Sequence, residues 1–238
     1  MVTHRYPERI VVLTGAGMSA ESGIETFRGA GGLWEGYRLE EVATPEAWTR
    51  QPEMVRRFYN ERRRNLMQSE PNKGHELLAE WQSRTSVQII TQNVDDLHER
   101  AGSKDVLHLH GELMKSRSCG PNASIMDMVK WEMTSNDRCP DGFPIRPHIV
   151  WFGEPVPNMS EAIEKVRSAD CLVVIGTSLQ VYPAAQLAFE ADDQARIHLI
   201  DPQAESLNQM GAKIWPMKAS EGLKELDQKW FGRRDSLI

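Results

Sequence analysis

Two side-chain amides, a carboxylate and an imidazole lie close together in the middle of this chain of 238 residues. Gln92 and Asn93 follow an apolar run, Asp95 comes two residues later, and His110 precedes a glycine that leaves one face of its ring open. The amides can orient a ribose hydroxyl or a carboxamide, and the carboxylate can stabilise positive charge that grows on a sugar carbon. His110 is the natural proton carrier near neutral pH. These residue types predict a nucleotide cofactor that is consumed in a reaction rather than only bound.

The same part of the chain also allows a structural interpretation. Asp95 and Asp96 could cap a helix over residues 95–100, and one of the two histidines, His108 or His110, could be a satisfied structural residue. For Asp96 and His108 we favour the structural role. For His110 we favour proton transfer, because it lies between a strand-like stretch and a glycine.

A glycine-rich turn follows the first apolar run of the chain. Gly15 and Gly17 stand directly after residues 9–14, where glycines let the backbone approach a pyrophosphate. Residues 20–23 could begin the helix whose N-terminal N–H groups favour anions. Two glycines after a strand can equally be only a tight turn. The cofactor interpretation is favoured by small or acidic groups at two further strand ends, namely Gly176, Thr177 and Ser178 after residues 171–175, and Asp201 after residues 197–200.

Short continuous runs of β-branched and apolar residues alternate with helical patterns along the chain. Such runs are typical of buried parallel strands, and their alternation with helices predicts an α/β fold with a doubly wound, parallel, Rossmann-like sheet. Ligands of such sheets bind at the carboxyl ends of the strands, which is where the polar residues lie. The predicted strands are residues 9–14, 86–91, 171–175 and 197–200, and the predicted helices include residues 53–67, 75–84, 159–168 and 220–231.

Two stretches do not fit this alternation and predict a smaller inserted lobe. We expect the lobe to comprise residues 31–72, which are partly helical, and residues 113–148, which show little periodicity. The remaining residues, 1–30, 73–112 and 149–238, would form the Rossmann-like domain.

Composition excludes several classes of protein. With 40% hydrophobic residues the chain can bury a full core, as one large domain or one domain with an inserted lobe. A formal charge of -6 and a pI of about 5.7 argue against a nucleic-acid surface. No apolar stretch reaches the ~18 residues of a membrane span, and the N-terminus lacks the apolar core of a signal peptide. We therefore expect a cytoplasmic protein without a disulfide framework, since it has only three cysteines.

Several ordered motifs resemble those of the sirtuins, the NAD-dependent protein lysine deacylases. The resemblance runs from about Ile10 to Asp201 and rests on GAGMSAESGI and TFR within residues 15–28, TQNVD at 91–95, HLHG at 108–111, VWFGE at 150–154 and GTSL at 176–179. It implies NAD as co-substrate. In sirtuins the acyl oxygen of a modified lysine attacks the nicotinamide ribose and nicotinamide leaves. The histidine that matches His110 then activates a ribose hydroxyl, and the products are free lysine and O-acyl-ADP-ribose.

The resemblance also implies roles for individual residues. His110, Asn93 and Asp95 would be catalytic. The substrate peptide would pair as an added strand, through main-chain hydrogen bonds, with a segment formed by Val150, Trp151, Phe152 and Gly153. The residues that would bind the cofactor are Gly15, Ala16, Gly17, Ser19, Phe27, Arg28, Gln92, Asn93, Asp95, Gly176, Thr177, Ser178 and Asp201. At the last of these, sirtuins commonly have asparagine, so cofactor affinity could differ.

A pair of residues in the first lobe segment bears on the acyl group. Tyr59 and Arg62 are three apart in a helical stretch and share one face, where a phenol and a guanidinium could hold a carboxylate. This Tyr-x-x-Arg is similar to the feature of class III sirtuins, which remove succinyl and malonyl groups, and Ala47 matches the small residue that makes room for longer acyl chains. The alternative is a solvated arginine cluster, since the same helix carries Arg56, Arg57, Arg62, Arg63 and Arg64.

The zinc pattern of most sirtuins, Cys-x-x-Cys twice in the small lobe, is broken here. Cys119 is followed three places on by Asn122, and Cys139 by Gly142. A closed tetrahedral zinc site needs four ligands. We therefore expect no structural zinc, or only a weakly bound one, and the sequence assigns no metal ligands.

Two other functions use the same residues. A mono-ADP-ribosyltransferase would cleave the same cofactor with a different nucleophile, and a non-catalytic module would only bind NAD or ADP-ribose. The set of Gln92, Asn93, Asp95 and His110 argues against the second. We expect acylated lysine proteins or peptides as partners, with neither nucleic acid nor membrane, and the sequence does not indicate an oligomeric state.

Overall fold

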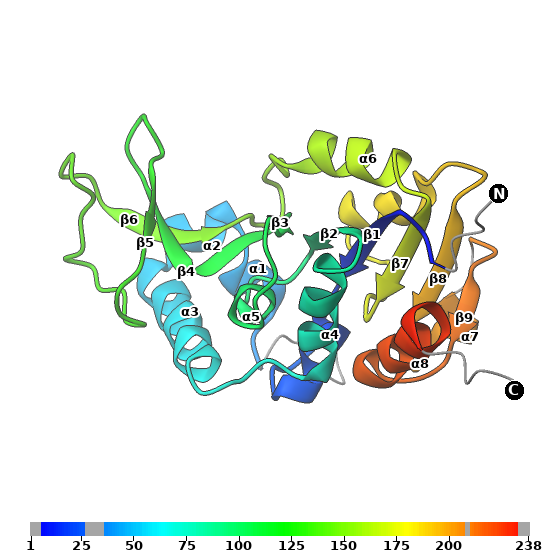
Figure 1. Cartoon of the computed structure of the whole chain (residues 1–238). Helices are drawn as coiled ribbons and strands as arrows, with labels where there is room; N and C mark the ends of the chain where they lie inside the picture. Colours follow the sequence, from blue (N-terminus) through cyan, green and yellow to red (C-terminus); the bar gives the residue numbers. More distant parts are fainter. Residues whose placement is uncertain (1–5, 27–35, 208–209, 233–238) are drawn as a thin grey trace, which may run out of the picture.

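The fold is described from a computed structural model that covers residues 6–26, 36–207 and 210–232. Six strands in these residues form a parallel sheet in the order β3-β2-β1-β7-β8-β9 (Figure 1). The strands are β1 (Arg9–Thr14), β2 (Ser86–Thr91), β3 (Leu107–His108), β7 (Cys171–Ile175), β8 (Arg196–Ile200) and β9 (Lys213–Trp215). The chain moves outward from β1 in one direction and from β7 in the other. The boundary between β1 and β7 is therefore the switch point at which sheets of this kind bind ligands.

The register of the strands brings the predicted polar residues together. Thr14 at the end of β1 is aligned with Thr91 of β2 and with Ile175 of β7. The next residues of these three strands, Gly15, Gln92 and Gly176, therefore leave the sheet at one level.

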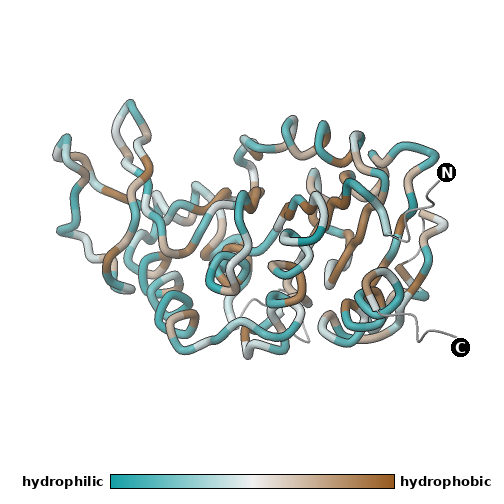
Figure 2. Tube along the Cα trace, viewed as in Figure 1, coloured by the Kyte–Doolittle hydropathy of each residue, from teal (hydrophilic) through white to brown (hydrophobic). Residues whose placement is uncertain are grey.

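Helices cover both faces of the large sheet (Figure 1). On one face, Ile10 and Val12 of β1 pack with residues of α4 (Lys73–Gln82) and α8 (Ala219–Phe231). On the other face, Val11 and Leu13 pack with α6 (Met159–Arg167) and the 3-10 helix η3 (Ala184–Phe189). Successive strand residues point to opposite faces, so a strand that is buried on both sides must be apolar throughout. The strands of the large sheet accordingly stand out as hydrophobic in Figure 2.

A smaller antiparallel sheet lies at the other end of the molecule (Figure 1). Its order is β5-β4-β6, with β4 (Gly111–Ser118), β5 (Ile125–Asp127) and β6 (Ile145–Ile149). Helices α1 (Leu39–Val42), α2 (Pro45–Arg50) and α3 (Pro52–Leu66) pack beside it. Phe58 and Tyr59 of α3 share an apolar cluster with Leu113, Ile149 and Trp151. The remaining short elements are η1 (Ala16–Met18), η2 (Ala20–Ser22), α5 (Leu97–Arg100) and α7 (Ala204–Leu207).

The structure confirms the expected fold class, an α/β Rossmann-like sheet with a small lobe, and differs from the sequence-based expectations in some details. Residues 20–23, expected to begin a helix, form only the 3-10 turn η2 (Ala20–Ser22), which ends at Gly23. Residues 113–148, whose sequence shows little periodicity, contain most of the antiparallel sheet. Strand β9 was not expected at all. Within the described residues no helix has the length and apolar character needed to cross a bilayer.

Candidate functional site

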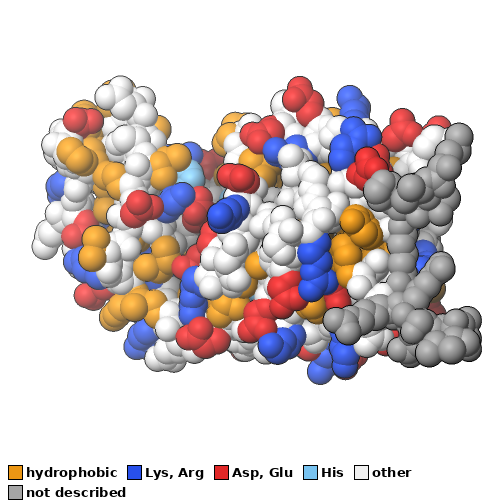
Figure 3. Space-filling view, in the orientation of Figure 1, with side chains coloured by type: hydrophobic (Ala, Val, Ile, Leu, Met, Phe, Trp, Pro, Cys, Tyr) orange, Lys and Arg blue, Asp and Glu red, His pale blue; other side chains and the backbone are white. Residues whose placement is uncertain are grey.

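A cleft of about 1040 Å³ opens where the carboxyl ends of the central strands face α3 and the end of β6. In Figure 3 the surface is notched between the small lobe and the body that carries the large sheet. The sequence-predicted residues that line the cleft are Gly15, Ala16, Gly17, Ser19, Tyr59, Arg62, Gln92, Asn93, Asp95, His110, Val150, Trp151, Phe152, Gly153, Gly176, Thr177, Ser178 and Asp201. Ala47 is not among the lining residues. Phe27 and Arg28 lie outside the described residues.

The glycines of the turn after β1 allow the ends of β1 and β7 to pack closely. A Cβ atom on Gly17 would lie 2.6 Å from the Cα of Gly176, and one on Gly15 would lie 2.7 Å from the Cβ of Thr177. Gly176 itself has φ +59°, which an L side chain rarely adopts. The Gly17 N–H donates to the Gly176 carbonyl at 2.8 Å. The turns at Gly15 and Gly176 thus pack together and line the cleft with main-chain atoms, which suits a pyrophosphate.

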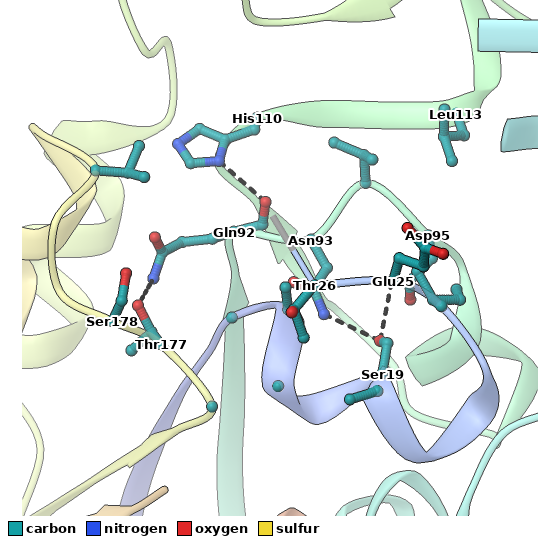
Figure 4. A pocket seen from close by; sticks show the side chains of 18 of the residues that line it. Ser19, Glu25, Thr26, Gln92, Asn93, Asp95, His110, Leu113, Thr177 and Ser178 are labelled. Atoms are coloured by element: carbon teal, nitrogen blue, oxygen red, sulfur yellow. Dashed lines mark hydrogen bonds between the residues drawn. The ribbon is translucent and has the colours of Figure 1, made fainter. Parts of the chain in front are cut away.

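His110 is held by a hydrogen bond that fixes the position of its proton. Its Nδ1 lies 2.9 Å from the main-chain oxygen of Gln92 (Figure 4). A carbonyl can only accept, so Nδ1 carries the hydrogen and, in the neutral ring, Nε2 keeps a lone pair. Burial lowers the pKa of His110 below its ordinary value, although the bond to Gln92 opposes the shift. The ring is therefore neutral at pH 7 and has one nitrogen ready to accept a proton.

Gln92 joins two strand ends across the cleft. Its side-chain amide donates to the Thr177 hydroxyl at 3.0 Å, while its main-chain oxygen accepts from His110 (Figure 4). This side chain therefore ties the loop after β7 to the loop after β2, whose Gln92 carbonyl holds the imidazole.

A chain of side-chain hydrogen bonds connects Asn93, Ser19 and Asp95 (Figure 4). The Asn93 amide donates to the Ser19 hydroxyl at 3.1 Å, and that hydroxyl donates to the Asp95 carboxyl at 2.9 Å. Burial raises the pKa of Asp95 to about 6, against the opposing effect of the Ser19 bond. The carboxylate is ionised at neutral pH and fixes the serine, which in turn orients the amide. Asp95 also accepts from the Leu97 N–H at 3.3 Å, so it has the structural role expected for a residue that precedes a helix.

His108 binds the main chain of the loop that carries Asn93 and Asp95. Its Nδ1 lies 3.2 Å from the Asn93 main-chain oxygen, and its Nε2 lies 2.9 Å from a carboxylate oxygen of Glu99. Both partners can act as acceptors, so the geometry favours the doubly protonated, cationic ring. Burial alone would lower the pKa of His108, but the hydrogen bond and the charge of Glu99 outweigh it and raise the pKa overall. The structural role expected for His108 agrees with this geometry.

Tyr59 and Arg62 meet at the far end of the cleft, as the helical spacing predicts. Tyr59 is fully buried, and its hydroxyl accepts from the Trp151 indole N–H at 3.0 Å. Burial raises the pKa of Tyr59, so the phenol stays protonated. The Arg62 guanidinium lies 3.2 Å from the centre of the Phe58 ring and donates to the Phe58 carbonyl at 2.7 Å. A protonated phenol and a guanidinium thus line the same part of the cleft.

The arginine cluster of α3 is only partly solvated. Arg62 is 5% exposed and Arg63 is fully buried, with Arg63 donating to the main-chain oxygens of Trp131 and Leu113. Arg57 is exposed. The solvated interpretation is therefore wrong for Arg62 and Arg63, and Arg63 ties α3 to Leu113 in β4 and to Trp131 after β5.

The small residue that lines the cleft beside Tyr59 and Arg62 is Ala43. Ala47, the residue chosen from the sequence, is the third residue of α2. It is buried and does not line the cleft. Ala43 also accepts a hydrogen bond from the Phe152 N–H at 3.0 Å. The motif Ala-Thr-Pro-Glu-Ala contains both alanines, and residue types alone do not distinguish which one faces the ligand.

The expected peptide-binding segment is already partly paired within the protein. The Val150 N–H donates to the His110 carbonyl, the Phe152 N–H to the Ala43 carbonyl and the Trp151 N–H to a carboxylate oxygen of Glu154. A substrate strand would have to use other main-chain groups of this segment. Phe152 is 41% exposed and offers an apolar surface at the same edge.

The cysteines do not build a metal site in the described residues. Cys119 is exposed and Cys139 is buried, and the Cys139 sulfur accepts from the Ser118 hydroxyl at 3.3 Å. No group of three or more His, Cys, Asp or Glu residues in the described part of the chain could hold a metal ion. The absence of zinc stays a prediction.

The groups that line the cleft fit a dinucleotide. Asp201 offers a carboxylate for ribose hydroxyls at one end, the turns at Gly15 and Gly176 offer main-chain atoms in the middle, and the amides of Gln92 and Asn93 lie at the other end. The cleft is also at the upper end of the ~300 to 1,000 Å³ range of ligand pockets, which leaves room for a second substrate.

Comparisons with known proteins match most of the chain. The model of the Sir2 family matches residues 15–183. A protein of Bacteroides thetaiotaomicron named NAD-dependent protein deacylase is 50% identical over 227 residues, which are 93% of this chain and 97% of that protein. A protein of the same name from Aggregatibacter actinomycetemcomitans is 56% identical over 192 residues, 81% of this chain and 92% of that protein. A solved Sir2 homologue in complex with NAD has 39% identity and a TM-score of 0.85, and the match covers 93% of this chain and 89% of that chain.

Proposed function

Because this chain belongs to the Sir2 family, we propose that it is an NAD-dependent protein lysine deacylase. It transfers the acyl group of a modified lysine to ADP-ribose and releases nicotinamide and O-acyl-ADP-ribose. The observation that carries the proposal is the hydrogen bond of His110 Nδ1 to the Gln92 carbonyl, in the cleft that also holds Asn93 and Asp95. A module that only binds a nucleotide does not require an imidazole held as a base.

The residues of the cleft divide the chemistry among them. Bound NAD supplies a ribose carbon with a good leaving group. The Nε2 lone pair of His110 takes a proton from a sugar hydroxyl and makes it nucleophilic. The Asn93 amide, fixed by Ser19 and Asp95, orients the sugar, and the negative charge of Asp95 favours a positively charged transition state. Asp95 can do this only when it is ionised, above its pKa of about 6.

Cofactor binding is assigned to the strand ends of the large sheet. We assign the pyrophosphate to the turn from Gly15 to Ser19, one ribose to Asp201, and the adenosine side to Gly176, Thr177 and Ser178. Phe27 and Arg28 are assigned to the cofactor from the family motif alone. We also propose a Rossmann-like domain of residues 1–30, 73–112 and 149–238, a lobe of residues 31–72 and 113–148, and a cytoplasmic location.

For the acyl group we propose acetyl, succinyl and malonyl. The buried Arg62 guanidinium and the protonated Tyr59 hydroxyl line the same cleft as His110, and both can donate hydrogen bonds to the carboxylate of a dicarboxylic acyl chain. Ala43 replaces Ala47 in this proposal as the small residue of the wall, because Ala43 lines the cleft. The peptide itself binds along Val150 to Gly153, with Phe152 beside it.

The test is product analysis with NAD and a succinyl-, malonyl- or acetyl-lysine peptide. Mass spectrometry should find the free-lysine peptide and the matching O-acyl-ADP-ribose, and His110→Tyr should abolish both. ADP-ribosylated peptide that keeps its acyl group would instead identify a mono-ADP-ribosyltransferase. Turnover by His110→Tyr at the rate of the unaltered protein would refute the role of His110.

A further inference from the structure

The indole of Trp151 makes a contact that peptide binding does not require. Trp151 belongs to the segment assigned to the peptide, but the residue is only 2% exposed and packs in one apolar cluster with Phe58 and Tyr59 of α3. Its Nε1–H donates to the Tyr59 hydroxyl at 3.0 Å. Trp151 and Tyr59 are 92 residues apart in the chain. The indole thus joins the peptide segment to the wall of the acyl site.

The indole is held in place from three directions. The Arg146 guanidinium lies 4.0 Å from the centre of its ring on one side, and the ring of Trp48 packs against it at 5.9 Å between centroids. The Trp151 main-chain N–H donates to Glu154 at 2.9 Å, and Glu154 in turn accepts from Arg146 and Arg117. A side chain fixed in this way delivers its N–H to one point with little freedom.

The hydrogen bond determines how the Tyr59 hydroxyl is used. An indole N–H can only donate, so the phenol oxygen accepts from it and the phenol proton must be directed elsewhere. Burial keeps the phenol protonated, because the charged form would be poorly solvated. Tyr59 and Arg62 line the same cleft, so the orientation of the hydroxyl decides which groups a carboxylate meets beside the guanidinium.

We infer that Trp151 is a positioning residue for acyl-group selectivity, which holds the Tyr59 hydroxyl in the orientation that favours dicarboxylic over acetyl substrates. The inference rests on the proposed deacylase function. It assigns to a residue of the peptide segment a role in recognition of the acyl chain, through an indole that donates to the Tyr59 hydroxyl.

The test is the ratio of kcat/KM for a succinyl-lysine peptide to kcat/KM for the acetyl-lysine peptide of the same sequence. Trp151→Phe keeps an aromatic ring under Arg146 and removes the N–H, and we expect the ratio to fall roughly tenfold, mainly through KM of the succinyl peptide. Trp48→Phe is the matched control, since it makes the same change in the neighbouring ring of the stack and should leave the ratio unchanged. In a Tyr59→Phe background, Trp151→Phe should cause no further fall, because the hydroxyl that it positions is gone.

A second substitution separates the N–H from the shape of the ring. Replacement of Trp151 by its benzothienyl analogue keeps the bicyclic ring and deletes only the donor, so it should lower the ratio as Trp151→Phe does. An unchanged ratio in the benzothienyl protein, or equal loss for both peptides in Trp151→Phe, would overturn the inference while the deacylase function stands. A protein that deacylates neither peptide would overturn both.

Discussion

The substitution Arg62→Met tests the acyl-carboxylate site most sharply. Methionine is unbranched and of similar reach, so it fills much of the space of the arginine stem without the charge. Arg62 is 5% exposed, and its guanidinium lies over the Phe58 ring, 3.2 Å from the ring centre. A hydrogen bond to a charged partner contributes roughly 1.5–3 kcal/mol, which corresponds to roughly a 10- to 100-fold change in an equilibrium or specificity constant.

We therefore expect kcat/KM for succinyl and malonyl peptides to fall roughly 10- to 100-fold relative to kcat/KM for the acetyl peptide. The bond from Arg62 to the Phe58 carbonyl is lost as well, so the melting temperature should fall and must be measured beside the kinetics. Arg57→Met, on the exposed side of the same helix, changes the net charge equally and should leave all three substrates unaffected. Equal losses for acetyl and succinyl peptides in Arg62→Met would assign Arg62 to the scaffold and refute the carboxylate site.

The remaining predictions concern the supports of the site. Ser19→Ala removes a bond that lowers the pKa of Asp95, so that pKa should rise above about 6 and the acid limb of the pH–rate profile should move to higher pH; an unmoved limb would contradict this role. Glu99→Gln should cost about 1 kcal/mol of unfolding free energy, because Glu99 is partly exposed. Since Glu99 raises the pKa of His108 above its ordinary 6.5, the loss of stability should be full below pH 6.5 and should disappear as pH rises through the raised pKa. Urea unfolding of both proteins across this pH range measures the loss. A loss that is the same at every pH would show that the pair is not ionic. Gly17→Ala should destabilise the protein by roughly 1–3 kcal/mol, because the new Cβ would lie 2.6 Å from the Gly176 Cα, and calorimetry should show it. Prolonged chelation should leave the melting temperature unchanged, whereas stoichiometric zinc in the purified protein would refute the metal-free lobe.

Some parts of the fold could be predicted because their signal is local. The central strands follow continuous β-branched runs, and β1 and β2 begin and end at the predicted residues. Helix α3 also carries a strong amphipathic pattern, and it is found within one residue of its predicted bounds. The Sir2 family assignment, which rests on motifs spread over much of the chain, is confirmed.

Other parts depend on contacts that are distant in the sequence. The antiparallel sheet pairs β4 with β6 across a long connection of weak periodicity, so no window of residues reveals it. The hydrogen bond from Trp151 to Tyr59 and the packing of Gly17 on Gly176 also join residues that are far apart in the chain, so the sequence did not reveal them.

The choice between the two alanines shows a third limit. Ala43 and Ala47 are four residues apart around the start of α2, and both are buried small residues. Only the direction of the cleft, which the Phe152–Ala43 hydrogen bond helps to set, makes Ala43 the lining residue. For Asn93, Ser19 and Asp95, the sequence predicted the residues of the site but not which of them hydrogen-bonds to which.

The proposed reaction couples cleavage of the bond between nicotinamide and ribose to deacylation of the lysine. The most direct measurement is the rate of nicotinamide release from NAD by the purified protein, with an acyl-lysine peptide and with the same peptide unmodified. We predict release only with the acylated peptide, with one nicotinamide formed for each lysine freed. Equal release with both peptides, or none with any acylated peptide, would contradict the account.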